Sequence, residues 1–554
     1  MAFDYTKPDT KSLVTAIYIF SAILCALGSS QTLRLDSSSK IDESLVYLWP
    51  LPSQFTFGNE TLVVDPDLSF SFEVGGNGGV SAIVKDAFER YRGIIFKHSS
   101  RFLRFRSIRK SAYDISKLRI IVRSDDEALQ LGTDESYSLL VARKNDHSII
   151  AEATIEANSV YGALRGLETF SQLCSFDYGT KTVQVYKAPW YIQDKPRFSY
   201  RGLLLDTSRH YLPVDVIKQV IESMSYAKLN VLHWHIIDEQ SFPLEVPTYP
   251  NLWKGAYTKS ERYTVEDAYE IVNFAKMRGI NIMAEIDIPG HAESWGAGYP
   301  DLWPSPSCRE PLDVTKNFTF DVVSGILTDM RKIFPFELFH LGGDEVNTDC
   351  WNFTPHVKQW LQDHNMTTKD AYQYFVLRAQ EIAISKSWIP VNWEETFNTF
   401  AEKLNPLTVV HNWLGPGVCP KAVAKGFKCI FSNQGVWYLD HIDVPWDRVY
   451  NAEPLEGITD ASKQKLVLGG EVCMWAEVVD ASNVQQTIWP RAAAAAERLW
   501  SNRDATSTRN TTVTALPRLQ YFRCLLTRRG VQAAPVTNKN ARSPPSGPGS
   551  CYEQ

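Results

Sequence analysis

Two adjacent carboxylates follow a strand-like segment in the middle of this 554-residue chain. The segment reads His340-Leu-Gly-Gly-Asp-Glu-Val346, and its two glycines, Gly342 and Gly343, let the backbone bend and approach a ligand closely. Asp344 and Glu345 come next, and we expect like-charge repulsion and apolar surroundings to raise the pKa of one of them. A carboxyl that stays protonated near neutral pH is a general acid. An acidic turn after a strand is the alternative interpretation.

Other strand-like segments also end in residues able to bind a ligand. Alone, a strand-end Asp usually caps a helix and a Trp usually packs in the core. Together, carboxylates, an arginine and aromatic rings predict a site for a ring-shaped, polyhydroxylated substrate. The residues are Asp206, Arg209, Asp238, Glu285, Asp287, Trp393, Glu394, Trp413, Tyr438, Asp440, Trp475 and Glu477.

Eight such segments alternate with mostly helical stretches, which predicts an α/β fold with a (β/α)8 TIM barrel whose site lies at the carboxyl ends of the strands. The units after the sixth and seventh strands are irregular. A doubly wound open sheet is the alternative, but no Gly-rich phosphate turn follows the first strand. The expected strands are 200–206, 231–238, 280–287, 336–345, 389–395, 408–414, 428–433 and 466–477.

A smaller α/β domain is expected to precede the barrel. Residues 49–195 mix short β-rich runs with a helix whose apolar face recurs at helical spacing from Val160 to Leu173. They contain no cluster that indicates chemistry. We therefore expect the catalytic barrel, with a C-terminal tail, to occupy residues 196–554.

Composition narrows the class of protein. The chain has 57 Lys and Arg against 63 Asp and Glu, a formal net charge of −6, and 44% hydrophobic residues. Without a basic block, a dedicated nucleic-acid binder is not expected. The hydrophobic fraction also excludes a disordered or collagen-like chain.

The first residues resemble a targeting segment. An apolar run, Leu13–Leu27, follows Lys7 and Lys11 and precedes small residues. It is shorter than the roughly 20 residues of a membrane span. We expect residues 1–29 to be a signal peptide, with an uncleaved signal-anchor as the alternative, and no membrane span in the mature chain.

Further features are typical of the secretory route. The eight cysteines after the leader form no CxxC pair, which disfavours structural zinc. Their even number permits disulfides, and proximity in the sequence favours Cys419–Cys429, whereas Cys473 is expected to be a buried thiol. Asn-x-Ser/Thr acceptors for glycosylation occur at Asn59, Asn317, Asn352, Asn365 and Asn510, and Pro355 makes Asn352 a poorer one.

Five motifs together resemble glycoside hydrolase family 20, the β-N-acetylhexosaminidases, over the chain from about Trp49 to its end, and the flanking sequence resembles a plant vacuolar or secreted member. One motif is the 340–346 segment. The others are Arg201-Gly-Leu-Leu-Leu-Asp-Thr-Ser-Arg-His-Tyr-Leu-Pro213, His233-Trp-His-Ile-Ile-Asp-Glu-Gln-Ser-Phe-Pro243, Asp287-Ile-Pro-Gly-His291 and Gly469-Gly-Glu-Val-Cys-Met-Trp-Ala-Glu477.

The resemblance implies exo-hydrolysis of terminal β-linked N-acetylhexosamine, GlcNAc and also GalNAc, with retention of configuration. In this family the substrate's acetamido oxygen is the nucleophile, and an oxazoline-type intermediate forms. Glu345 then matches the acid/base. Asp344 matches the residue that holds the acetamido N–H, and Tyr438 the phenol that binds the acetamido oxygen.

The remaining site residues are also assigned by resemblance. Trp393, Trp413 and Trp475 match the indoles around the acetamido methyl and the sugar face. Arg209 and Glu477 match the pair that binds the sugar hydroxyls. Asp238 and His291 match residues that orient the acid.

Partners and disulfides follow from the same resemblance. It implies the pairs Cys308–Cys350 and Cys524–Cys551, a glycan or glycoprotein substrate, no cofactor or metal, and a homodimer. The vacuole is the expected location, with the cell exterior as the alternative. Relatives that accept anionic sugars place a cation after the tyrosine, whereas this chain has Asp440 followed by His441, so we expect anionic substrates to be disfavoured.

Two other functions remain open at the level of sequence. A metal-dependent hydrolase is one, because His233 and His235 point to the same strand face and Asp238, His291 and Glu345 are further ligand candidates. Two satisfied core histidines are the commoner outcome of that pattern. A catalytically silent carbohydrate-binding protein is the other function, although binding alone does not need a poised acid.

Overall fold

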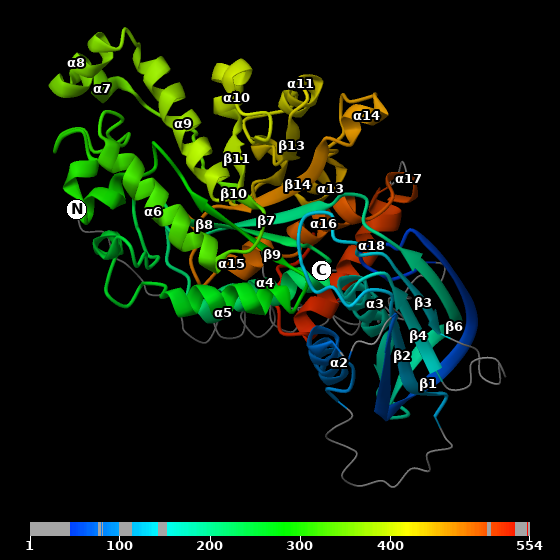
Figure 1. Cartoon of the computed structure of the whole chain (residues 1–554). Coiled ribbons are helices and arrows are strands. Elements are labelled where there is room, and N and C mark those ends of the chain that lie inside the picture. The colour runs from blue at the N-terminus through cyan, green and yellow to red at the C-terminus, as the bar shows by residue number, and fades with distance from the viewer. Residues whose placement is uncertain are drawn as a thin grey trace, which may run out of the picture.

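The computed structural model describes residues 45–75, 79, 81–98, 113–141, 152–506, 511–537 and 551. The predicted signal peptide at residues 1–29 and the acceptor Asn510 lie outside the described residues. Figure 1 shows the described chain as a barrel surrounded by helices, with a smaller sheet beside it.

The larger part is a closed barrel of eight parallel strands in the order β10-β11-β12-β13-β14-β7-β8-β9. This confirms the predicted (β/α)8 barrel and excludes the open sheet. Most of its strands are buried on both faces, as parallel strands covered by helices must be. The strands are β7 Tyr200–Asp206, β8 Val231–Ile237, β9 Asn281–Ile286, β10 Leu338–His340, β11 Ile389–Trp393, β12 Val409–Asn412, β13 Lys428–Phe431 and β14 Val467–Met474.

Helices follow the strands around the barrel. Two of them begin at complete capping boxes, in which Thr264 pairs with Asp267 and Thr367 with Asp370. The helices after β12 and β13 are short, which accounts for the irregular sequence pattern there. The helices are α4 Val214–Tyr226, α5 Val265–Lys276, α6 Asn317–Ile333, α7 Asp349–Phe353, α8 Pro355–Asp363, α9 Thr368–Ser385, α10 Glu394–Phe400, α11 Val418–Ala424, α12 Gln434–Trp437, α13 Trp446–Asn451, α14 Ala461–Gln464, α15 Val484–Ile488, α16 Arg491–Trp500, α17 Arg503–Thr506 and α18 Thr511–Arg528.

The N-terminal part is a six-stranded mixed sheet in the order β1-β2-β4-β3-β6-β5, with β1 also paired to β6. The predicted helix is α3, Val160–Leu173, and α2, Ala82–Ile95, packs beside it. Apolar side chains of both helices and the sheet form one core. The strands are β1 Gln54–Val74, β2 Ile115–Val122, β3 Tyr137–Val141, β4 Glu152–Ala157, β5 Cys174–Asp177 and β6 Thr182–Asp194.

The smaller sheet and its helices contact the amino-terminal ends of the barrel strands. Buried Glu135 accepts hydrogen bonds from Arg165 of α3 at 2.8 Å and from Arg201 of β7 at 2.7 Å. Lys228, just before β8, contacts Asp194 of β6 at 3.0 Å. The carboxyl ends of the strands, where barrel sites form, therefore lie on the opposite side.

Disulfides and exposed acceptor asparagines complete the description. The structure forms Cys308–Cys350, Cys419–Cys429 and Cys524–Cys551, and the Cys473 thiol is buried. Asn59, Asn317, Asn352 and Asn365 are all exposed. Among the helices that the structure describes, none has the length and apolar character needed to cross a bilayer.

Candidate active site

The residues singled out in the sequence come together around the carboxyl ends of the barrel strands. Asp206 and Trp393 are the last residues of β7 and β11. Asp238, Trp413 and Trp475 follow β8, β12 and β14 within a residue. Tyr438, although it comes later after its own strand, pairs with Cys473 of β14 in an isolated bridge.

The glycine turn after β10 brings the two adjacent carboxylates to this end of the barrel. Gly342 has φ +61°, and a Cβ there would lie 1.8 Å from Oδ1 of Asp287. The N–H of Gly343 donates to the same Oδ1 at 2.8 Å. Glu345 itself has φ +47°, a conformation that costs a non-glycine residue energy and is concentrated at functional sites.

Glu345 is connected to Asp238 through one imidazole. Nε2 of His291 lies 3.6 Å from the Glu345 carboxylate, and Nδ1 lies 3.1 Å from Asp238. Asp238 also contacts Arg209 at 2.7 Å and His235 at 2.8 Å. Burial disfavours a charge on Asp238, but the donors His235, His291 and Arg209 outweigh it and hold its pKa well below the ordinary range.

The expectation of a raised pKa is wrong for Glu345 in this arrangement. Its side chain is 60% exposed, and the contact with His291 lowers its pKa. Burial acts against a charge on His291, but the charges of Asp287 and Asp344 and the contacts with Asp238 and Glu345 raise its pKa far above the ordinary value. Of these two groups, the His291 imidazole therefore carries the proton.

Asp344 stands in different surroundings. Its Oδ1 is buried without a hydrogen-bond partner among the described residues, so it is free to accept from a ligand. Burial, followed by the charge of Asp344, raises the pKa of Asp287 well above the ordinary range. The like-charge effect predicted for the Asp344 and Glu345 pair thus acts on Asp287, which lies behind the glycine turn.

Aromatic rings form one side of the site. Trp393, Tyr438 and Trp475 belong to one small apolar cluster, and Trp413 packs against it. The rings of Trp413 and Tyr438 are nearly parallel, 12° apart with centroids separated by 6.2 Å. The centroid of Trp475 lies 6.0 Å from that of Trp393 and 6.1 Å from that of Tyr438. These rings present apolar surface beside the carboxylates.

The residues assigned to the hydroxyl side of the substrate are only partly paired. Arg209 contacts Asp206 at 3.2 Å and Asp238 at 2.7 Å, and its Nε has no hydrogen-bond partner in the described part of the chain. Glu477 is exposed, and its charge helps to raise the pKa of Arg209. Burial raises the pKa of Asp440 to about 6.

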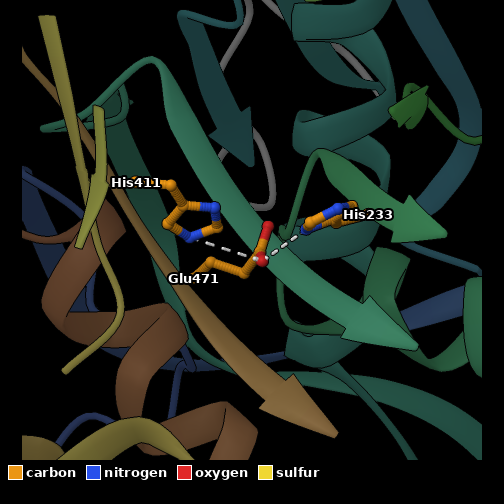
Figure 2. A group of neighbouring side chains, drawn as sticks. All are labelled: His233, His411 and Glu471. Carbon is orange, nitrogen blue, oxygen red and sulfur yellow. Dashed lines mark hydrogen bonds and ion pairs between the residues drawn. The ribbon is translucent and has the colours of Figure 1, made fainter. Parts of the chain in front are cut away.

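Buried histidines and two glutamates fill the barrel below the site. Figure 2 shows His233 and His411 on either side of Glu471, at 2.8 and 3.7 Å. Glu285 lies 2.5 Å from His235 and 3.0 Å from His233. Burial alone would lower the pKa of His233, but the two glutamates raise it to about 9.

These contacts show which histidine and carboxylate side chains lie close enough together to hold a metal ion. The atoms of His233, His411 and Glu471 are close enough to hold a metal ion, and so are those of His233, Glu285 and His340. A third such group is Asp287, His291 and Asp344. The full set that the sequence offered, His233 and His235 with Asp238, His291 and Glu345, is not among these groups of described residues: His233 contacts Glu471 and Glu285, whereas His235 contacts Glu285 and Asp238.

Comparison with known proteins identifies the family. The profile of the glycosyl hydrolase family 20 catalytic domain matches residues 198–503, and one described as beta-acetyl hexosaminidase like matches residues 48–173. Beta-hexosaminidase 1 of Arabidopsis thaliana is 72% identical over 536 residues, which cover 96% of this chain and 98% of that protein. The chain belongs to glycosyl hydrolase family 20. It is therefore a glycosidase.

Other family 20 proteins support this. Beta-hexosaminidase 3 of Arabidopsis thaliana is 55% identical over 92% of this chain and 94% of its own length. The chitobiase of Flavobacterium johnsoniae superimposes with a TM-score of 0.75 at 28% identity, over 88% of this chain and 73% of that one.

The sequence analysis placed two residues at strand ends without a role, and the structure gives each of them a contact. Asp287 anchors the glycine turn, and Glu285 accepts a hydrogen bond from the Trp393 indole at 3.0 Å. A third, Glu395, was not singled out, although its position beside Trp393 and Glu394 was the available signal. It accepts from Trp413, and burial and the charge of Asp344 raise its pKa to about 8.

Proposed function

We propose that this family 20 glycosidase removes terminal non-reducing β-linked N-acetylhexosamine, GlcNAc and also GalNAc, from glycans by retaining, substrate-assisted catalysis. The observation that carries the proposal is an aromatic cluster at the same end of the barrel as two carboxylates in unlike surroundings. An acetamido group needs both, because its methyl is apolar and its amide is polar. The relatives named beta-hexosaminidase support the same activity.

The roles follow from the surroundings of each residue. Glu345 protonates the leaving oxygen and later deprotonates the attacking water. The free Oδ1 of Asp344 accepts the acetamido N–H, while the Tyr438 hydroxyl donates to the acetamido oxygen. That oxygen attacks C1, the bond to the leaving oxygen breaks, and water then opens the oxazoline-type intermediate with overall retention.

The proton supply is the less obvious part. Glu345 has a lowered pKa and is largely exposed, so in open solvent it is a poor acid. A bound sugar covers it, and loss of water raises the pKa of a carboxyl. The protonated Nε2 of His291 lies 3.6 Å from the Glu345 carboxylate and then transfers its proton to Glu345. Asp238 holds the imidazole in place from the other side.

The direct test compares two neutral chromogenic glycosides, one of GlcNAc and one of glucose. Without the acetamido group there is no nucleophile, so we expect the glucoside to react at least about 1000-fold more slowly. This is a conservative figure, because well-oriented intramolecular nucleophiles reach effective molarities of roughly 10⁵ M or more. The anomer released first, followed by NMR, is expected to be β. Equal rates, or an α product, would contradict the mechanism.

The acid is tested by Glu345→Gln. This variant is expected to bind the GlcNAc product normally but to lose turnover by about 100-fold or more, the usual contribution of a general acid. Unchanged turnover would remove Glu345 from this role, and a wild-type protein that binds but never turns over would favour the silent binding function.

Substrate charge is expected to matter at Asp440. We propose that Asp440, with His441 at 3.7 Å, faces the 6-hydroxyl side and repels an anionic group there. A 6-sulfated GlcNAc glycoside should therefore be hydrolysed more slowly than the neutral one, and the difference should shrink below pH 6 as Asp440 takes up a proton. A strong preference for the sulfated substrate would refute the proposal.

No metal or cofactor is needed in this mechanism, because the substrate supplies the nucleophile and His291 the proton. Exhaustive chelation is expected to leave activity unchanged. A loss of activity that zinc or manganese restores would favour the metal-dependent hydrolase, with the donors around His233 as the first residues to examine.

We also propose that the protein enters the secretory pathway, carries N-glycans and works in the vacuole, with the cell exterior as the alternative. The apolar run near the N-terminus, the exposed acceptor asparagines and the disulfides support this route. A C-terminal fluorescent fusion and digestion with an N-glycan amidase test it. Retention of the fusion in the cytosol would contradict it.

A homodimer is proposed on separate grounds. Large apolar side chains are exposed in segments that follow barrel strands, among them Leu414, Ile442 and Val478. Such residues are often covered by a partner chain. Light scattering coupled to gel filtration should give twice the chain mass, and a monomer at micromolar concentration would contradict the proposal.

A further inference from the structure

The short helix α10 begins with two glutamates that both contact the loop after β12. Oε2 of Glu394 accepts from the backbone N–H of Trp413 at 2.8 Å and from that of Leu414 at 3.2 Å. It also accepts from the side chain of Asn412 at 2.6 Å. Glu394 therefore fixes the backbone path of this loop.

Glu395 contacts the ring of the same tryptophan instead. The indole Nε1 of Trp413 donates to both carboxylate oxygens of Glu395, at 2.9 and 3.1 Å. Nε1 is the only polar atom of that ring. A carboxylate that receives it with two oxygens restrains rotation of the indole about its side-chain bonds.

Trp413 needs such a restraint more than the other two indoles of the pocket. Trp393 is 1% exposed in the barrel core, where Glu285 holds its Nε1. Trp475 is buried as well. Trp413 is only half-buried and lies in a loop whose next residue, Leu414, is exposed. Core packing alone therefore fixes its ring less firmly.

The orientation of Trp413 sets the spacing between its ring and that of Tyr438. Its ring lies nearly parallel to that of Tyr438, the residue proposed to bind the acetamido oxygen. If the indole rotated, this spacing would no longer be fixed. The charge of Asp344, the residue proposed to hold the acetamido nitrogen, also raises the pKa of Glu395.

We propose that Glu395 is a positioning residue for acyl-group selection: by holding the Trp413 indole, it keeps the pocket at the size of an acetyl group and excludes larger acyl groups. This inference rests on the proposed function, because it concerns the group at C2 of the sugar. Glu395 itself need not touch the substrate.

The test is a double-mutant cycle with Glu395→Gln and Trp413→Phe. Rates are measured on chromogenic glucosaminides that carry an N-acetyl, N-propionyl or N-butyryl group. Glutamine keeps the shape of the side chain but replaces one acceptor oxygen with a donor, and phenylalanine keeps an aromatic ring without the N–H. Glu402→Gln, whose side chain is 81% exposed, is the matched control and should behave as wild type.

For Glu395→Gln we expect kcat/KM on the N-acetyl substrate to fall by up to about tenfold, the upper end of what one hydrogen bond contributes. The rate on the N-propionyl substrate relative to the N-acetyl substrate should rise by at least about threefold, which is within the free-energy range of one hydrogen bond. Adding Glu395→Gln to Trp413→Phe should change little further, because both variants remove one interaction.

Two outcomes would overturn the inference. One is an unchanged acyl preference in Glu395→Gln, and the other is a full, multiplicative loss when it is added to Trp413→Phe. If Glu395→Gln does not fold, Glu395→Asp, which keeps the carboxyl group but withdraws it by one methylene, replaces it in the cycle. A wild-type protein that ignores the acyl group altogether would instead refute the proposed function.

Discussion

Glu345 and Asp344 are neighbours in the chain but stand in unlike surroundings. Glu345 points to solvent and accepts from a charged imidazole, whereas Asp344 is buried and keeps an oxygen free for a ligand. The two carboxylates can therefore do different work in one site, one transferring a proton and the other binding an amide. Asp238 is the residue that maintains this difference, because it holds both His291 and Arg209.

Asp238→Asn tests this arrangement through the pH profile. Asn removes the negative charge that favours the protonated His291, so the pKa of His291 falls and the imidazole loses its proton at a lower pH. Because His291 supplies the proton in the proposed mechanism, the alkaline limb of kcat/KM against pH should move to lower pH. We also expect kcat to fall by up to about 100-fold, the cost of misplacing a reacting group.

Asp363→Asn, an exposed substitution on α8, is the control and should leave the profile in place. A shift of the alkaline limb to higher pH in Asp238→Asn would contradict the proposed link from Asp238 to the acid.

At the scale of elements, the turn after β10 decides where the carboxylates stand. Gly342 packs against Asp287 of the segment after β9, and Gly343 is bonded on both sides, by Asp287 and by the Tyr372 hydroxyl of α9. Three neighbouring elements thus fix one turn. The Cys308–Cys350 disulfide ties the region just after the turn, at α7, to the loop that follows β9.

Gly342→Ala is expected to abolish activity and lower the thermal midpoint. The positive φ alone costs an alanine about 1–2 kcal/mol. In addition, the new Cβ would meet Asp287 at 1.8 Å, so the turn or Asp287 must move. Activity assays and thermal unfolding measure the two effects.

Gly426→Ala distinguishes the backbone strain of a positive φ from the steric clash of the new Cβ with Asp287. Gly426 also has a positive φ, +91°, but open space around it. It should lose about 1–2 kcal/mol of stability and keep full activity. Equal behaviour of the two variants would show that the contact with Asp287 does not matter.

At the scale of the whole molecule, the smaller sheet packs against the end of the barrel at which the strands begin. Buried Glu135 pairs with both Arg165 and Arg201, and burial lowers the pKa of Arg201 despite this negative charge. The site at the other end of the barrel is left open to a glycan chain. The sheet is thus expected to contribute stability rather than chemistry.

Glu135→Gln tests that role. It keeps the shape of the side chain but leaves two buried guanidinium groups without their counter-charge, which typically costs about 3–5 kcal/mol. We expect a marked fall in the unfolding midpoint with KM unchanged in the protein that remains folded. Glu73→Gln, in the exposed pair with Arg119, should change the midpoint little.

The sequence by itself determined the alternation of strands and helices, the barrel, and the strand-end positions of the residues placed in the site, because these depend on local periodicity and on the fixed polarity of parallel strands. Only the tertiary structure decided the charge on each group. His291 carries the proton, Asp287 rather than Glu345 has the raised pKa, and Glu395 holds the Trp413 ring. Burial and Coulomb interaction depend on distances between residues far apart in the chain, and no spacing along the sequence encodes those distances.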